Sequence, residues 1–331
     1  MSWRKQEDLG TQLVARIYEL LKVDDAWSID CGRGFTYWPS DYAVTVSCDL
    51  PNFHNAYCIF RLHSSVQVAR GKGSPDSAEL RLSEMMSRAA LSALTYDEPN
   101  DLYKIHGSVY AHTDNEDWLT RVFMATVGLQ IQRAPLVAKE LKEQLGFTPM
   151  PSAHPMHGAR TQPDPMVAAI PQLFQNYGSS PSKWLNSNEW HEAYSQMRRL
   201  TVSCKSDNQT CLSATFEWLT DDPIELEIQA NTPHPELGSG LSLELKVPWS
   251  SHTEMIGHIA LELNHMERDD WNWCHDLGAW CLADGMLTFR CFVPNIAYRP
   301  GCLTDLAHDM ALRARWVNEQ AALKAMGVEI A

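Results

Sequence analysis

The sequence predicts an α+β protein of two tandem modules, each an antiparallel sheet with flanking helices in the order α-β-β-β-α-β-β-α. Three observations lead to this prediction. The chain has 331 residues, which is more than one hydrophobic core usually serves. Both halves contain runs of alternating apolar and polar residues, typical of strands with one solvated face. Between these runs, apolar residues recur at helical spacing.

The predicted organisation is a first module over residues 1–147, a proline-rich linker with a short helix over 148–181, and a second module over 182–331. Around the start of the linker the chain reads FTPMPSAHPMHGARTQPDP. Its prolines oppose helix formation, and its small polar residues cannot build a core. We therefore expect a flexible join, followed by a short helix over 166–177.

The first module begins with an amphipathic pattern and continues with two clean period-two alternations. Gly71 to Pro75 interrupts the sheet, and Gly146 is placed to end the last helix. The expected elements are a helix, three strands, a helix, two strands and a helix, over 7–22, 27–41, 42–50, 58–68, 76–95, 102–112, 118–129 and 134–145.

The second module repeats this plan. Asn186 or Ser187 is a suitable N-cap for its first helix. The dipeptide Asp284-Gly285 between apolar runs is a strong hairpin signal. The expected elements are a helix, three strands, a helix, two strands and a helix, over 188–200, 212–218, 224–228, 241–247, 253–268, 279–282, 287–293 and from Cys302 onward.

Charge and composition exclude several classes of partner. The formal net charge is −14, whereas nucleic-acid binding needs a concentrated basic surface. No apolar run is long enough to span a bilayer, and the N-terminal segment MSWRKQEDLG lacks the apolar part of a secretory signal. The nine cysteines form no CxxC pair, which favours a reducing cytoplasm over a disulfide framework. We expect a cytoplasmic protein without a nucleic-acid or membrane partner.

No catalytic or cofactor-binding motif is present: Walker A, GxGxxG and GxSxG are all missing from the sequence. The best metal-like set is His258, Glu262 and His265, whose spacings of four and three place them on one helical face. The same spacing is typical of the solvated face of an amphipathic helix, and we favour that interpretation. No catalytic residue, metal or cofactor is therefore expected.

Three short segments of the second half carry a resemblance to a known family. They are 261–264 (Leu-Glu-Leu-Asn), 278–280 (Gly-Ala-Trp) and 284–289 (Asp-Gly-Met-Leu-Thr-Phe). A helix that ends in a Leu-Asn element, a glycine-led hairpin and a closing helix resemble the type III secretion chaperone-like fold of YbjN-related bacterial proteins, here in a tandem version. The resemblance implies protein binding without catalytic residues. It also implies that the pairing of two such modules can lie inside one chain, which would leave the protein monomeric.

The leading hypothesis is therefore a chaperone-like or adaptor protein that binds another protein or an extended polypeptide segment. Aromatic anchors are favoured at such interfaces, so a subset of the tryptophans is expected to line a partner-binding groove. The candidates are Trp184, Trp190, Trp271, Trp273 and Trp280. The alternative is an enzyme or small-ligand binder with its site in the cleft between the modules. A convergent polar pocket that contains His258 or His275 would be its sign.

Overall fold

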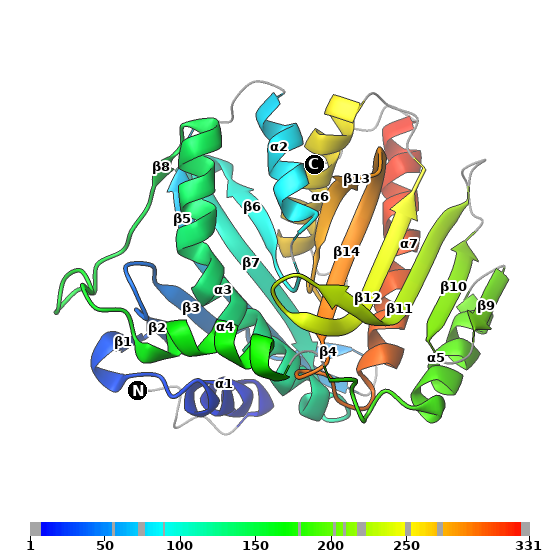
Figure 1. The fold of residues 1–331 in the computed structure, drawn as a ribbon, viewed down its shortest axis with the longest axis horizontal. Coiled ribbons are helices and arrows are strands. Elements are labelled where there is room, and N and C mark those ends of the chain that lie inside the picture. Colours follow the sequence, from blue (N-terminus) through cyan, green and yellow to red (C-terminus); the bar gives the residue numbers. More distant parts are fainter. Residues whose placement is uncertain are drawn as a thin grey trace.

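The structure is a computed structural model, and it confirms the predicted fold class, with two antiparallel sheets and their flanking helices (Figure 1). It describes residues 8–54, 57–71, 77–88, 90–177, 180–200, 203–207, 210–216, 223–248, 253–269 and 274–325.

The first sheet has the strand order β1-β2-β3-β5-β7-β6, with the short strands β4 and β8 pairing with β5. Its strands are β1 (Ser28–Asp30), β2 (Gly34–Tyr37), β3 (Val44–Cys48), β4 (Asn52–His54), β5 (Tyr57–Arg70), β6 (Ala93–Asp97), β7 (Leu102–Ala111) and β8 (Thr148–Pro149). The helices of this region are α1 (Leu9–Leu20), α2 (Ser77–Met86), α3 (Glu116–Leu145) and α4 (Pro165–Tyr177), with 3-10 turns at Asp25–Trp27 and Glu98–Asn100.

The second sheet has the order β9-β10-β11-β12-β14-β13. Its strands are β9 (Ser203–Asp207), β10 (Cys211–Phe216), β11 (Ile224–His234), β12 (Gly238–Val247), β13 (Ala279–Ala283) and β14 (Met286–Pro294). Its helices are α5 (Ser187–Leu200), α6 (Thr253–Asp269) and α7 (Cys302–Ala325).

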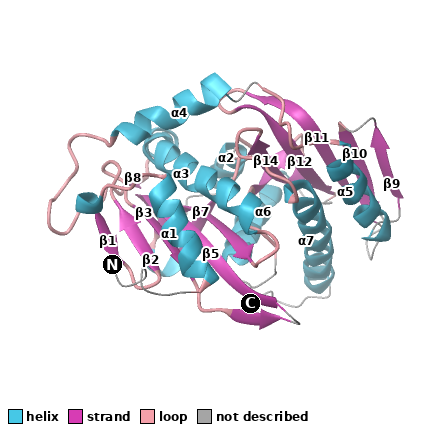
Figure 2. Ribbon diagram, turned by 90° about the horizontal axis from the view of Figure 1, so that it is seen from below, coloured by secondary structure: helices cyan, strands magenta, loops and turns pink. Residues whose placement is uncertain are grey.

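Apart from the short strands β4 and β8, the two sheets match strand for strand. In each, the strand that follows the middle helix forms one edge, the next strand along the chain pairs with it, and the remaining four strands follow in reverse chain order. The first and last helices of each module, α1 with α3 and α5 with α7, pack on each other and on one face of their own sheet (Figures 1 and 2). The chain therefore contains two copies of one architecture.

One prediction for the first module was wrong. The segment expected to form a strand over 118–129 and a helix over 134–145 is a single helix, α3, of 30 residues. Its first half is rich in β-branched and aromatic residues and is buried nearly all round, so its apolar pattern has no helical period. The hydroxyls of Thr120 and Thr126 donate to the carbonyls of Glu116 and Val122, which satisfies them inside the helix.

A second correction concerns the helix expected over 76–95. The helix α2 ends at Met86, and Ala93–Asp97 forms the edge strand β6. Strand β6 supplies one of the two strands predicted after the middle helix. Before the middle helix the predicted order was wrong, because the segment 27–41 forms two strands, β1 and β2, so that four main strands and not three precede α2, as they precede α6. Strand β9 was not predicted, because its sequence Ser-Cys-Lys-Ser-Asp has no apolar alternation.

Several local predictions are confirmed. Gly146 ends α3 in the left-handed conformation, with φ of 71°. Asp284 and Gly285 both have positive φ, 52° and 78°, as a tight hairpin turn between β13 and β14 requires. The Asn186 side chain accepts a hydrogen bond from the backbone N–H of Asn188 at 2.9 Å and so caps α5.

The proline-rich segment lies against the first module and is held there by side chains. Trp38 Nε1 donates to Ser152 Oγ at 3.1 Å, and Tyr37 Oη donates to Asp164 Oδ2 at 2.7 Å. Arg160 donates to the Trp38 carbonyl at 2.7 Å and lies over the ring of Trp27. The segment that we expected to be a flexible join is thus bound by these hydrogen bonds to Tyr37 and Trp38, at the end of β2.

Candidate functional site at the junction of the modules

The modules meet through their middle helices in a reciprocal arrangement. Helix α2 of the first module packs against β13 of the second, α6 of the second packs against β6 of the first, and the two helices pack on each other (Figure 1). Each middle helix therefore covers the edge strand of the opposite sheet. This is the pattern of a twofold interface between identical subunits, realised within one chain.

Backbone groups cross the junction directly. The N–H of Ser108 in β7 donates to the carbonyl of Asp276 at 3.1 Å, and the N–H of Phe292 in β14 donates to the carbonyl of Ala90 at 3.0 Å. The N–H of Leu282 in β13 donates to Ser83 Oγ of α2 at 2.5 Å. These bonds fix the register of one module on the other and satisfy backbone groups that burial would otherwise leave unpaired.

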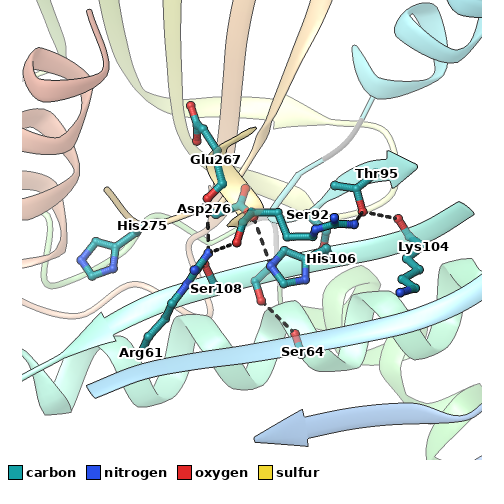
Figure 3. A network of polar contacts seen from close by, with 12 residues as sticks. Arg61, Ser64, Ser92, Thr95, Lys104, His106, Ser108, Glu267, His275 and Asp276 are labelled. Atoms are coloured by element: carbon teal, nitrogen blue, oxygen red, sulfur yellow. Dashed lines mark hydrogen bonds and ion pairs between the residues drawn. The ribbon is translucent and has the colours of Figure 1, made fainter. Parts of the chain in front are cut away.

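Arg61 of β5 joins the first sheet to the end of α6 (Figure 3). Its guanidinium, 6% exposed, donates to Ser108 Oγ at 3.2 Å and to the carbonyls of Glu267 and Arg268 at 3.2 and 2.5 Å. Both carbonyls lie in the last turn of α6, where the backbone has no helical partners and the helix dipole favours a cation. Arg61 is thus the cap of a helix that belongs to the other module.

Behind this cap lies a fully buried ion pair. Arg313 of α7 donates to Glu267 Oε1 at 2.7 Å and to Oε2 at 2.9 Å, and both side chains are 1% exposed. Trp280 Nε1 also donates to Glu267 Oε1, at 2.6 Å, and the Arg313 guanidinium lies 3.7 Å from the ring centre of Phe289. Each charge therefore has several partners, as burial demands.

Asn264, the last residue of the segment 261–264 singled out in the sequence, connects α6 to β13. Its side-chain amide donates to the carbonyl of Trp280 at 2.9 Å and accepts from the N–H of Trp280 at 2.8 Å. The amide thereby ties α6 to the second residue of β13. In the first module, Met86 of α2 occupies the corresponding place, and its sulfur accepts from the N–H of Leu94, the second residue of β6.

His106 of β7 and Asp276 face each other at the junction, with Nε2 and Oδ2 3.5 Å apart. Burial lowers the pKa of His106 well below its usual value. Burial, with the neighbouring Glu267 carboxylate, raises the pKa of Asp276 to about 8. Both side chains are therefore uncharged at neutral pH, and neither facing atom makes a hydrogen bond within the described residues.

Next to this pair, a polar hollow of about 380 Å³ opens between α7 and the ends of β5 and β7. It is lined by Asp305, His308, Asp309 and Leu312 of α7, by Ile59 and His112 of the first module, and by His275. Figure 3 shows the His275 ring pointing away from Asp276. Burial lowers the pKa of His275 to about 4 and raises the pKa of Asp309 to about 7.

A second, apolar groove of about 190 Å³ lies between α2 and α3, over the edge formed by β6 and β7. Its apolar lining is Met85, Met86, Ile105, Leu129, Leu136 and Val137. Leu136 is 57% exposed, although it points toward this groove from the middle of a helix. Arg88, Arg133 and Glu140 surround the opening, so the groove has an apolar floor and a charged rim.

The three predicted tryptophans that the structure describes do not gather on one surface. Trp190 and Trp280 are 2% and 0% exposed, so they are core residues and are removed from the partner-binding set. Trp184 is 38% exposed and lies under the ammonium of Lys183. Trp271 and Trp273 lie outside the described residues. The tryptophans were chosen by residue type alone, which does not distinguish an interface from a core.

The metal-like set on α6 is a surface cluster. His258 Nε2 lies 2.9 Å from Glu262 Oε1, and both side chains are 48% exposed, as on the solvated face of a helix. In the part of the chain that the structure describes, no group of three or more histidine, cysteine, aspartate or glutamate residues could hold a metal ion.

Comparisons with known proteins give no relative. No family model, no curated protein and no solved structure matches the chain. Among the described helices, none is both long enough and apolar enough to cross a membrane.

Proposed function

We propose that this protein is a chaperone-like adaptor without catalytic activity, and that it binds another protein through the apolar groove between α2 and α3. The observation that carries the proposal is Leu136, which is 57% exposed at the mouth of a groove whose other apolar lining residues are buried. Leu136 differs from other exposed apolar residues, such as Leu173, in that it borders a groove with an apolar floor. The duplicated chaperone-like element order, and a location in the cytoplasm, fit the same proposal.

The groove suits an amphipathic helix of the partner. A helical partner inserts apolar anchors at spacings of three and four into such a groove, while its polar residues meet the rim. Met85 and Met86 provide an adaptable floor, because methionine side chains are unbranched and polarisable. Arg88 and Glu140 at the rim offer both signs of charge to the polar face of the partner.

The test compares two matched surface variants in affinity capture with quantitative mass spectrometry. Leu136→Asp places a charge in the groove, whereas Leu173→Asp makes the same change on α4, at a residue that is 48% exposed and outside the groove lining. We expect partners captured by the wild-type chain to bind Leu136→Asp at least about tenfold more weakly, since one buried leucine contributes roughly 1.5–3 kcal/mol. Leu173→Asp should bind as the wild type does.

Circular dichroism and thermal melting of both variants would check that the fold is intact, as expected for two leucines that are each about half exposed. Equal capture by the two variants would remove the groove from the proposal. Absence of any partner specific to the wild type, together with turnover of a small molecule by the pure protein, would contradict the adaptor function itself.

A further inference from the structure

The polar hollow carries a second inference, which does not depend on the proposed function. We propose that it binds a small aliphatic amine in its ammonium form, with a hydroxyl or similar oxygen on the same molecule. Three features favour such a ligand: an imidazole N–H of the lining that has no acceptor in the protein, the charges around the hollow and its apolar walls.

The donor is Nε2 of His275, an accessible nitrogen of a residue that lines the hollow. This side chain is 6% exposed, and its Nδ1 accepts a hydrogen bond from the N–H of Tyr110 at 3.0 Å. A neutral imidazole that accepts at Nδ1 carries its proton on Nε2. Asp309 Oδ2 lies 3.9 Å away, beyond hydrogen-bond distance, and no other acceptor in the described residues bonds to Nε2. An oxygen of a ligand in the hollow would satisfy this donor.

The charges favour a cation. Two carboxyl groups, those of Asp305 and Asp309, line the hollow, and its lining contains no lysine or arginine. The nearby cation of α7, Arg313, lies one turn beyond Asp309 on the same helical face. It is paired with both oxygens of Glu267 and also donates to the His275 carbonyl at 3.0 Å. Asp305 Oδ2 accepts from Trp118 Nε1 at 2.8 Å and Asp309 Oδ2 from the N–H of His275 at 2.8 Å. Each carboxyl is thus fixed in place by one bond and keeps its other oxygen for a ligand.

The walls favour an aliphatic chain. Ile59 of β5 and Leu312 of α7 close the hollow with apolar surface beside the carboxyl groups. A chain of a few methylene groups can lie against them while its ammonium group meets Asp309 and its oxygen meets His275. The volume of about 380 Å³ is within the range of small-molecule sites.

Isothermal titration with defined probes tests the inference on the full chain. The probes are 4-amino-1-butanol, 1-butylamine without the hydroxyl and 1,4-butanediol without the charge. We expect the amino alcohol to bind best, the amine more weakly and the diol not at all. Asp309→Asn should weaken amino-alcohol binding at least about tenfold, because it removes a charge-assisted hydrogen bond but keeps an acceptor for the His275 N–H.

Asp284→Asn is the matched control, since it removes the same charge from a turn residue whose side chain is 91% exposed and outside the hollow. It should change the affinity less than about twofold, as expected for a screened surface charge. If Asp309→Asn fails to fold, Asp305→Asn is tested in its place, and we expect it to weaken amino-alcohol binding several-fold. Three outcomes would overturn the inference. The diol could bind as well as the amine, the aspartate variant could bind as well as the wild type, or the amino alcohol could fail to bind at millimolar concentration.

Discussion

The two middle helices, α2 and α6, occupy the same place in their modules and yet hold the following strand by different chemistry. Asn264 of α6 bonds both the N–H and the carbonyl of Trp280 in β13, whereas Met86 of α2 accepts only the N–H of Leu94 in β6. A thioether is a weak acceptor and cannot donate. The comparison shows that a backbone plan can be kept while the side chains that secure it change, which is why the duplication is visible in element order and hardly in residues.

The modules also differ in what they bury under their last helix. In α3 the buried polar residues are Thr120, Thr126 and Gln130, which are uncharged. In α7 the corresponding burial includes the charges of Asp309 and Arg313. Neutral groups can be satisfied within their own helix, whereas buried charges need partners from several elements. The second module should therefore be more sensitive to single substitutions than the first.

The largest expected effect is that of Arg313→Met. Removal of one partner leaves the Glu267 carboxylate buried and unpaired, so we expect a loss of about 3–5 kcal/mol in the free energy of unfolding. Urea denaturation followed by tryptophan fluorescence measures it. The double variant Arg313→Met, Glu267→Met should recover part of the loss. A cost below about 1 kcal/mol for the single variant would show that the pair adds nothing beyond packing.

The next effect compares the two middle helices with one matched change. Asn264→Leu leaves both backbone groups of Trp280 unpaired, and each buried unpaired group costs about 1–3 kcal/mol. Met86→Leu conserves volume and loses one weak acceptor, so it should cost less than about 1.5 kcal/mol. Both are measured by denaturant unfolding. If the methionine variant were the more costly, the two residues would not have corresponding roles.

The smallest effect concerns pH and the carboxyl of Asp276. Its pKa of about 8 in the fold exceeds the value near 4 of an unfolded chain, so the folded state binds more protons between these values. The stability that this group contributes is complete below pH 4 and is lost as the pH rises through 8. Asp276→Asn should flatten this decline and stabilise the fold by about 1–3 kcal/mol at pH 8.

Thermal melts between pH 6.5 and 9 provide the measurement. In this range His275, whose pKa is lowered to about 4 by burial, stays neutral in the fold, and the titration of its unfolded imidazole near pH 6.5 is common to the variant and the wild type. Arg61, Arg268, Arg313 and Glu267 face Asp276, as does His106, and Asp309 has a pKa that burial raises to about 7. All are present in both the variant and the wild type, so the difference between the two pH curves isolates Asp276. Parallel pH curves for the variant and the wild type would contradict the raised pKa.

The fold could be predicted where one face of an element is solvated. Side chains of strands β3, β10 and β12 alternate between core and surface, so the sequence of each strand shows a period of two. Helix α3 has no such contrast, because the sheet, α1 and α4 surround it. The first half of α3, rich in β-branched residues, was therefore predicted as a strand. The edge strand β9 was not predicted, because its sequence has too few apolar residues to form an alternating pattern.

The candidate site could be predicted only in part, because its members are distant in sequence. Glu267 and Arg313 are 46 residues apart, and neither forms a motif with its neighbours. One signal was available: Arg313 falls on the apolar stripe of the last helix, in line with Leu306 and Met310. A charge at a core position predicts a buried partner, although it does not name the partner.

The reciprocal packing of α2 and α6 has a consequence for divergence. In an assembly of two identical chains, every substitution occurs twice, so a change that suits one side is imposed on the other. Fusion in one polypeptide removes this constraint and also keeps the halves at high effective concentration. One side could then acquire buried charges and an open acidic recess while the other retained a methionine-lined surface. The buried charges under α7, against the uncharged polar groups under α3, are an asymmetry of the kind that one chain allows and two identical chains do not.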